Sequence, residues 1–231
     1  MFTFQPSIDP SVSTLAPDFC ALSIFVQAAP VVNPQIGALT LYHACEQMLK
    51  DDFPWAEEHL QQWAELFKRF GAKPKRTPCS ADALRKRVQR EGVMAAIDPI
   101  VDLYNAVSIR FAIPVGGEHV AAYVGQPHLT RADGTENFDV FKEGVLSHES
   151  PEPGEVIWRD DVGVTCRRWN WRQGVRTRLS LGQSQMWFIL ERLPAMPLEA
   201  LHQAGDMLEQ GIQQIMPGAT ITRTLLGNDD R

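Results

Sequence analysis

The chain lacks most features that would assign it directly to a catalytic or targeting class. It has no GxSxG, HExxH or GxxxxGK[ST] motif, so the common signatures of serine hydrolases, zinc proteases and P-loop enzymes are absent. No segment of about 18 residues is free of charge or strong polarity, and we expect no transmembrane helix. The N-terminus, MFTFQPSIDPSVST, lacks the basic and apolar blocks of a signal peptide. We therefore expect a cytoplasmic protein.

Metal-binding patterns are also missing. The four cysteines (Cys20, Cys45, Cys79 and Cys166) form no CxxC pair, which argues against a disulfide framework and against a zinc site built on cysteine pairs. The six histidines include no pair three or four residues apart in one predicted helix. We expect neither a metal nor another cofactor.

Positive charge is scarce overall but concentrated in two stretches. The 231 residues carry a net charge of -6, which excludes a generally basic nucleic-acid binder with a pI above about 9. Residues 68–91 nevertheless carry +7 and residues 167–178 carry +5, which leaves -18 for the rest. Such a distribution would attract a phosphate backbone to one face and repel it from others. The first stretch could equally be a solvated helix face.

Hydrophobic patterning predicts an α+β protein, and 44% hydrophobic residues are enough for a sizeable core. We expect residues 1–18 to form a loose arm and residues 19–231 a single domain, as a monomer or homodimer. An apolar seam on the last helix could pack on the protein's own sheet or across a dimer. The predicted elements are a buried strand over 19–29, helices over 34–50, 54–70, 81–91 and 99–112, short strands over 113–191, a helix from residue 197 and a strand near 219–226.

Two local strings could line a site. Asp102, Asn105 and Ser108 share one strip of the helix predicted over 99–112, and this strip is either a solvated face or a pocket wall. Gly116 and Gly117 follow a short apolar run, where they would permit a tight turn or a close approach of the backbone to a ligand.

A third string, CRRWNWRQ over residues 166–173, interleaves arginine and tryptophan. Arginine pairs with phosphate through its planar fork, and tryptophan offers a face on which bases stack. The string is therefore a candidate RNA contact. Alternatively, it is a ladder of cation–π contacts on a sheet, paired with nearby acids.

Taken in order, these strings resemble the B3/B4 domain of the β subunit of bacterial phenylalanyl-tRNA synthetase. The resemblance covers roughly residues 80–192. It rests on a PIVDLYNAVS helix, a Pro-Val-Gly-Gly-Glu string, LTRADGTENF, Pro153-Gly154-Glu155 with Asp160, an arginine-rich turn, and a strand that ends in Glu191. The resemblance implies an α+β fold with a β-sandwich-like core of mixed sheets flanked by helices, and a pocket between sheet and helix. In the synthetase, that pocket hydrolyses tRNA charged with the wrong amino acid, chiefly tyrosine.

The resemblance also implies roles for individual residues. Asn105 matches a pocket asparagine and Glu191 a pocket glutamate, whereas Tyr104 replaces a threonine and Gly116 a histidine. The expected catalytic set is Asn105, Gly116, Gly117 and Glu191, in which the backbone N–H groups at the two glycines stabilise negative charge. The expected substrate-binding set is Tyr104, Glu118, Trp169 and Asn170. The expected tRNA contacts are Arg167, Arg168, Arg172, Lys75 and Arg76.

Three functions fit these residues. The first is a free-standing hydrolase that cleaves the ester of a mischarged aminoacyl-tRNA. The second is a module that binds tRNA or an amino acid without turnover, which the absent histidine and the bulky Trp-Asn-Trp turn favour. The third is a metabolic enzyme acting on a small amino-acid-like ligand.

Overall fold

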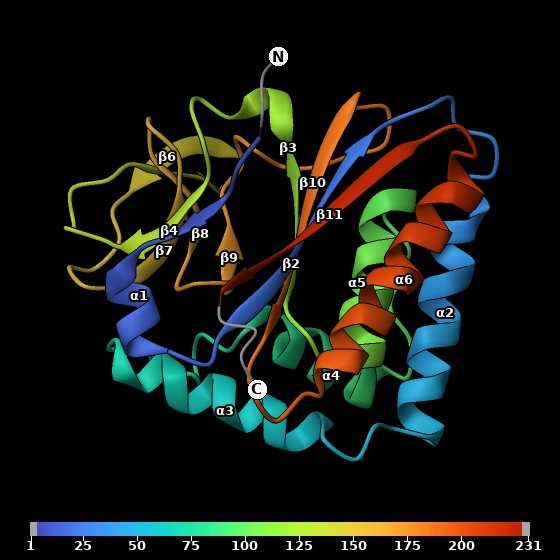
Figure 1. The fold of residues 1–231 in the computed structure, drawn as a ribbon, viewed down its shortest axis with the longest axis horizontal. Coiled ribbons are helices and arrows are strands. Elements are labelled where there is room, and N and C mark those ends of the chain that lie inside the picture. Colours follow the sequence, from blue (N-terminus) through green and yellow to red (C-terminus); the bar gives the residue numbers. More distant parts are fainter. Residues whose placement is uncertain (1–3, 228–231) are drawn as a thin grey trace.

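The structure, a computed structural model, describes residues 4–227. The outer ends of the predicted arm and domain, residues 1–3 and 228–231, lie outside the described residues. Two β-sheets and six α-helices form the described part, which confirms the α+β prediction (Figure 1).

The smaller sheet has four strands in the order β11-β2-β10-β3. Its central strands are hydrophobic because both faces are covered, a pattern typical of buried strands. All the pairings in this sheet are antiparallel. The strands are β2 (Cys20–Gln27), β3 (Val115–His119), β10 (Gln185–Arg192) and β11 (Thr220–Gly227).

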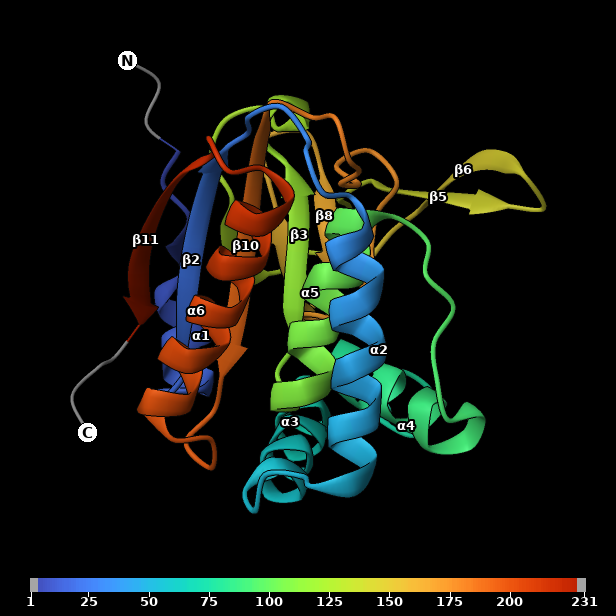
Figure 2. The same ribbon diagram turned by 90° about the vertical axis from the view of Figure 1, so that its right-hand side faces the viewer.

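Three helices, α2 (Gln35–Lys50), α5 (Pro99–Phe111) and α6 (Leu198–Ile215), stand on one side of this sheet (Figures 1 and 2). Leu201, Leu208 and Ile212 of α6 are fully buried in the same core cluster as Leu22 and Ile24 of β2. The predicted apolar seam therefore packs on the protein's own sheet, the first of its two expected arrangements.

The larger sheet covers the other face of β10, and its strands follow the order β1-β4-β7-β8-β5-β6, with β9 paired to β8. The β5–β6 hairpin projects away from the body (Figure 2). Trp158 of β7 and Trp187 of β10 meet edge to face between the sheets, with ring centroids 5.3 Å apart. The strands are β1 (Ser7–Ile8), β4 (His128–Arg131), β5 (Phe138–Lys142), β6 (Val145–Glu149), β7 (Val156–Arg159), β8 (Val164–Arg167) and β9 (Arg172–Gln173).

Two further helices, α3 (Ala56–Arg69) and α4 (Ser80–Glu91), cross below the sheets in the view of Figure 1. His59 of α3 is fully buried, and its ring links the Ala112 carbonyl (2.8 Å from Nδ1) to the Leu193 N–H (3.0 Å from Nε2). Burial lowers the pKa of His59 to about 4. The histidine is thus a neutral connection between α3, the end of α5 and the end of β10.

Helix starts follow local sequence signals with small displacements. Asp98 caps α5, since its Oδ1 accepts hydrogen bonds from the N–H groups of Ile100 and Val101. By contrast, α2 begins at Gln35, one residue after the predicted start at Pro34, and no side chain caps it; the Asn33 side chain donates to a carbonyl of α6. Similarly, Ser80 is the first residue of α4 rather than its cap.

Two expectations about irregular segments are wrong. The predicted loose arm contains β1, which pairs with β4, and α1 (Pro10–Leu15), whose Val12 is fully buried. Of the two alternatives for Gly116 and Gly117, the turn is wrong, because both residues lie within β3 and pair with Ile189 and Phe188 of β10. Both errors have one cause, since long-range strand pairing overrides the local preference of proline and glycine for irregular backbone.

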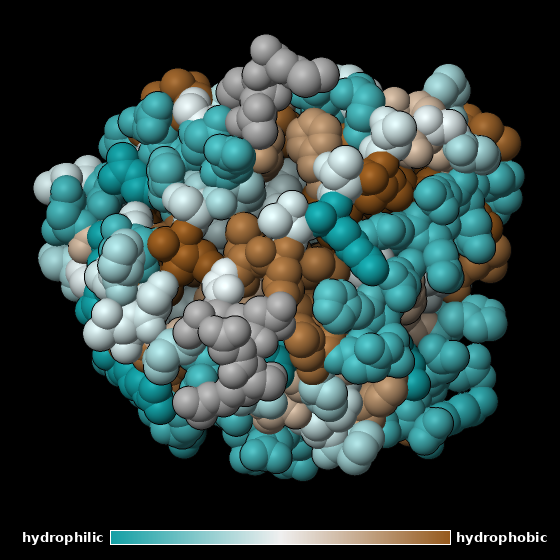
Figure 3. All heavy atoms as spheres, viewed as in Figure 1, coloured by the Kyte–Doolittle hydropathy of each residue, from teal (hydrophilic) through white to brown (hydrophobic). Residues whose placement is uncertain are grey.

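The face seen in Figure 3 is mostly hydrophilic over α6 and α2, whereas hydrophobic residues gather where β11 and β2 cross. Within residues 4–227, no helix combines the length and hydropathy needed to span a membrane.

The close approach of α2 to the start of α5 gives a stability prediction. A Cβ atom at Gly37 would lie 2.1 Å from the Pro99 carbonyl oxygen, which is backbone and cannot rotate away. We expect Gly37→Ala to lower the free energy of unfolding by about 1–3 kcal/mol, measured by urea denaturation. Leu39→Ala, an exposed change on the same helix, is the control and should cost no more than about 0.5 kcal/mol. Equal losses in the two variants would contradict this packing.

Candidate functional site

A cavity of about 290 Å³ opens between the two sheets and the helix layer. Elements far apart in the sequence line it: α4, α5, β3, β7, β8, the β8–β9 turn and β10. Its lining includes all eight residues expected in the catalytic and substrate-binding sets, namely Tyr104, Asn105, Gly116, Gly117, Glu118, Trp169, Asn170 and Glu191.

The polar strip predicted on α5 divides into buried and cavity-lining residues. Asp102 is buried and accepts a hydrogen bond from the Ile97 N–H, and the buried Ser108 hydroxyl donates to the Ile113 carbonyl. Asn105 lines the cavity. Only this residue of the three is therefore available to a ligand there.

Glu191 sits at the centre of the cavity wall, 1% exposed. Its Oε1 accepts from the indole N–H groups of Trp158 (2.8 Å) and Trp169 (3.1 Å), and its Oε2 accepts from Asn170 Nδ2 (2.8 Å). Burial raises the pKa of Glu191 to about 7, against the three N–H donors, which favour the ionised form. Glu191 thus holds β7, β10 and the β8–β9 turn together.

Glu118 is the second buried acid of the cavity, 4% exposed, and it pairs with Trp187 across β3 and β10. Burial raises the pKa of Glu118 to about 8, while the Thr177 and Gln173 side chains and Arg176 act in the opposite direction. No described residue forms a hydrogen bond with its Oε2. The Asn170 Oδ1 is likewise buried without a partner among the described residues.

The two glycines give the cavity its shape. A Cβ at Gly117 would lie 2.6 Å from the Tyr104 ring, so the absence of a side chain lets the α5 ring approach β3. The Gly117 carbonyl accepts a hydrogen bond from Gln173 Nε2 at 2.7 Å, which links β3 to β9.

The turn between β8 and β9 has an unusual backbone. Arg168 and Trp169 both have positive φ, 45° and 64°, a conformation that costs non-glycine residues of the order of 1–3 kcal/mol each. Fixed contacts compensate for it: the Arg168 N–H donates to Glu155 Oε1 and the Trp169 N–H to the Val156 carbonyl. Trp169 is also enclosed, with its ring 4.9 Å from Phe19 and 5.4 Å from Trp63.

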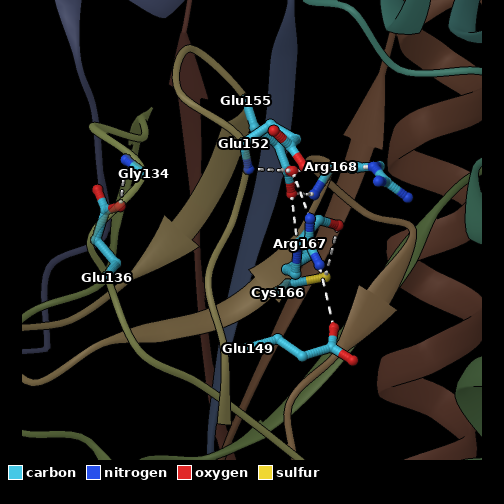
Figure 4. Close-up of polar contacts among 8 residues, drawn as sticks. All are labelled: Gly134, Glu136, Glu149, Glu152, Glu155, Cys166, Arg167 and Arg168. Atoms are coloured by element: carbon cyan, nitrogen blue, oxygen red, sulfur yellow. Dashed lines mark hydrogen bonds and ion pairs between the residues drawn. The ribbon is translucent and has the colours of Figure 1, made fainter.

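Of the expected tRNA contacts, Arg167 is wrongly assigned. Its guanidinium is buried and bonds both oxygens of Glu155, through Nε at 3.0 Å and Nη2 at 2.8 Å, while Nη1 reaches Glu149 (Figure 4). Figure 4 shows this network with the Glu155 and Arg167 side chains directed toward each other. The acids that bind Arg167 lie on β6 (Glu149) and in the loop before β7 (Glu155), so the RRWNWR string alone could not reveal them.

The remaining cations of the string are more accessible. Arg168 stacks over the Trp171 ring at 4.4 Å and is half-buried, whereas Arg172 is exposed. Lys75 and Arg76 are exposed as well, in the loop before α4. Neither these two nor Arg172 forms an ion pair with another described residue. The Ser80 N–H donates to the Asn170 carbonyl, which fixes the start of α4 beside the turn.

Sequence analysis missed several cavity residues. Trp187 and Ile189 are two of them; they alternate with the expected Glu191 along β10 and therefore face the same side, a signal that the sequence contains. Trp158 and Cys166 come from the other sheet, and no local pattern places them here. Cys45, Cys79 and Cys166 are free thiols, and within residues 4–227 no three His, Cys, Asp or Glu side chains are grouped as a metal site requires.

Comparison with known proteins identifies the family of the chain. The B3/4 domain family matches residues 62–198, more than half of the chain, which confirms the resemblance stated from the sequence. Among curated proteins, no sequence relative is found. A similar solved structure is an N-terminal fragment of the phenylalanyl-tRNA synthetase β-subunit from Pyrococcus horikoshii, with 8% identity and a TM-score of 0.46. That alignment covers 99% of this chain, and this chain spans 55% of the other.

The two buried acids make stability depend on pH. Each binds a proton more tightly in the folded protein than in the unfolded chain, where the usual glutamate pKa is 4.5, so the folded state holds more protons between about pH 5 and pH 8. The free energy of unfolding should then fall as the pH rises through this window, by up to about 1.4 kcal/mol per pH unit per group. Glu118→Gln should make the fall shallower in urea denaturation at pH 5–9. The exposed change Glu57→Gln is the control, and an identical slope in E118Q and E57Q would count against a proton held by Glu118.

The buried ion pair gives a second prediction. Arg167→Ala leaves the Glu155 carboxylate buried without its guanidinium, and we expect a loss of about 3–5 kcal/mol in the free energy of unfolding. Arg172→Ala removes an exposed arginine from the same turn and should cost no more than about 0.5 kcal/mol. Chemical denaturation of the two variants side by side measures the difference, and similar costs would show that Arg167 is not engaged as described.

Proposed function

Because the chain belongs to the B3/4 domain family, we propose that it is a tRNA-related module whose cavity receives the aminoacyl end of a mischarged tRNA and hydrolyses its ester. The observation that carries the proposal is the convergence of all eight expected pocket residues on one cavity. At about 290 Å³, the cavity is near the lower limit of typical ligand pockets, about 300 Å³, and suits one amino-acid group. The protein would act in the cytoplasm.

The reaction needs little from the protein beyond positioning. A water oxygen attacks the ester carbonyl carbon, the bond to the ribose oxygen breaks, and that oxygen takes up a proton, which releases the amino acid and the uncharged tRNA. Asn105 would orient the carbonyl or the amino group from α5. Gly117 directs its peptide groups away from β10, toward Gln173, whereas Gly116 directs its own toward β10. The Gly117 N–H would therefore stabilise the negative charge that develops on the carbonyl oxygen.

Glu191 has a different part in this proposal from the one expected from the sequence. Its oxygens already accept three N–H bonds, so it holds the wall of the cavity and leaves little capacity for a substrate group. The tRNA phosphates would contact Arg172, Lys75 and Arg76, with Arg168 partly available. Arg167 makes no such contact, because Glu155 and Glu149 bind its guanidinium.

A second candidate is a module that binds the aminoacyl end without turnover. Two observations favour it: the occupied state of Glu191 and the glycine at position 116, where the synthetase family has a histidine. The two candidates share the same ligand and differ only in the fate of the ester.

Deacylation of a panel of mischarged tRNAs separates the two candidates. We expect at least one aminoacyl ester to decay faster with the protein than in buffer, and Asn105→Ala to lower kcat by about 10–100-fold because the reacting group is no longer oriented. Decay of every ester at the buffer rate, with tRNA binding intact, would contradict the hydrolase and leave the binding module.

Charge reversal tests the tRNA surface. The triple variant K75E/R76E/R172E should weaken tRNA binding at least tenfold and reduce the slope of log Kd against log salt, because phosphate contacts release counterions. Lys50→Glu, an exposed change on α2 on the other side of the four-stranded sheet, is the matched control and should leave both quantities near wild type. An unchanged Kd in the triple variant would remove these residues from the interface.

A further inference from the structure

Four buried side-chain polar atoms have no partner among the described residues, and two of them, Glu118 Oε2 and Asn170 Oδ1, belong to residues that line the cavity. The other two, Thr177 Oγ1 and Trp63 Nε1, belong to residues outside its lining. Glu118 and Asn170 are 4% and 8% exposed, so bulk water reaches them poorly. Buried polar groups in folded proteins are nearly always hydrogen-bonded, and an exception in a cavity points to a missing ligand. Glu191, the other acid of the same cavity, shows the usual state with its three N–H donors.

The surroundings indicate the charge of that ligand. The guanidinium that lowers the pKa of Glu118, that of Arg176, already bonds both oxygens of Asp160 at 2.8 Å each, so its charge is matched elsewhere. Arg178 pairs with Glu118 across an isolated β-bridge, but it is exposed and does not line the cavity. The cavity walls include the indoles of Trp158, Trp171 and Trp187, whose faces attract cations. Two acceptors and aromatic faces, with no Lys or Arg among the described residues that line the cavity, complement a positively charged group that carries N–H donors.

We infer that the cavity binds a protonated primary amine, with Glu118 as its counter-charge and Asn170 Oδ1 as a second acceptor. The inference rests on the proposed function only in identifying the amine with the α-ammonium group of an aminoacyl ester. It assigns this recognition to Glu118 on β3 rather than to Glu191 on β10.

Binding should be coupled to proton release. Burial raises the pKa of Glu118 to about 8, so its carboxyl is mostly protonated at pH 7 while the cavity is empty. An ammonium group favours the ionised form, so the carboxyl proton leaves to solvent as the amine binds. The titratable and charged groups near Glu118 are Tyr104, Tyr123, Asp160, Cys166, Arg176, Arg178 and, across the cavity, Glu191.

The test uses 2-phenylethylamine and 3-methylbutylamine as probes. The alcohols 2-phenylethanol and 3-methylbutanol, which have the same carbon skeletons and no charge, are the controls. Isothermal titration calorimetry at pH 7, in two buffers of different ionisation enthalpy, should show release of close to one proton per amine bound. The amine affinity should rise up to about tenfold from pH 6 to pH 7, whereas the alcohol affinity should not rise. Equal affinities of amine and alcohol, or no proton release, would overturn the inference.

Variants test whether the proton released on amine binding comes from Glu118. Glu118→Gln keeps the size of the side chain; it should abolish proton release and lower the affinity for the amine at least tenfold. Glu118→Asp should retain proton release and bind the amine more weakly than the wild type. Glu136→Gln is the matched control, because Glu136 is buried outside the cavity against the N–H groups of Asp133 and Gly134 (Figure 4). Unchanged amine binding in E118Q would overturn the assignment.

The outcomes also separate this inference from the proposed function. Amine binding with proton release, together with no deacylation of any tRNA, would retain the inference and reject the hydrolase. Deacylation that E118Q leaves unchanged, together with no amine binding, would retain the hydrolase and reject the inference.

Discussion

The cavity wall depends on one buried carboxylate and its three N–H donors. Glu191 belongs to β10 in the smaller sheet, while its donors Trp158, Trp169 and Asn170 belong to β7 and the β8–β9 turn of the larger sheet. An ionisable group that is 1% exposed is costly to desolvate unless its oxygens are satisfied, so the three donors are required wherever the acid is retained. The same bonds fix the distance between the sheets, and this spacing leaves room for a cavity.

The turn beside Glu191 shows how the protein holds an unfavourable backbone in place. Arg168 and Trp169 adopt positive φ without being glycines. Glu155 bonds the Arg168 N–H and the Arg167 guanidinium, and aromatic rings enclose the Trp169 indole. The arginine-rich string therefore mainly stabilises the turn, and only Arg172 and, in part, Arg168 remain available to a phosphate. The two cavity acids therefore differ in role: three N–H donors of the protein bind Glu191, whereas Glu118 Oε2 remains available to a ligand.

Local signals predicted much of the fold. The helices predicted over 99–112 and 54–70 are present as α5 and α3, with ends that differ by at most two residues. The order of short strings was enough to identify the B3/B4 domain and to select eight residues that meet in one cavity. Capping, turn chemistry and helical periodicity depend on residues that are close in sequence, so they can be predicted from the sequence alone.

The errors all involve partners distant in sequence. Gly116 and Gly117 pair with β10, more than 70 residues away, which local turn chemistry cannot anticipate. Arg167 is buried because Glu155 and Glu149 lie on the strands and loops around it, and residues 7–8 are ordered because they pair with β4. The open state of Glu118 also depends on which donors fail to reach it, and no sequence pattern contains that information.

The most direct test of this account is an NMR titration of the Glu118 and Glu191 carboxyl carbons, with and without 2-phenylethylamine. The account predicts that Glu118 titrates near pH 8 in the free protein and at lower pH when the amine is bound, while Glu191 titrates near pH 7 in both states. A Glu118 carboxyl that titrates at the same pH with and without saturating amine would contradict the claim that the cavity is built around this acid.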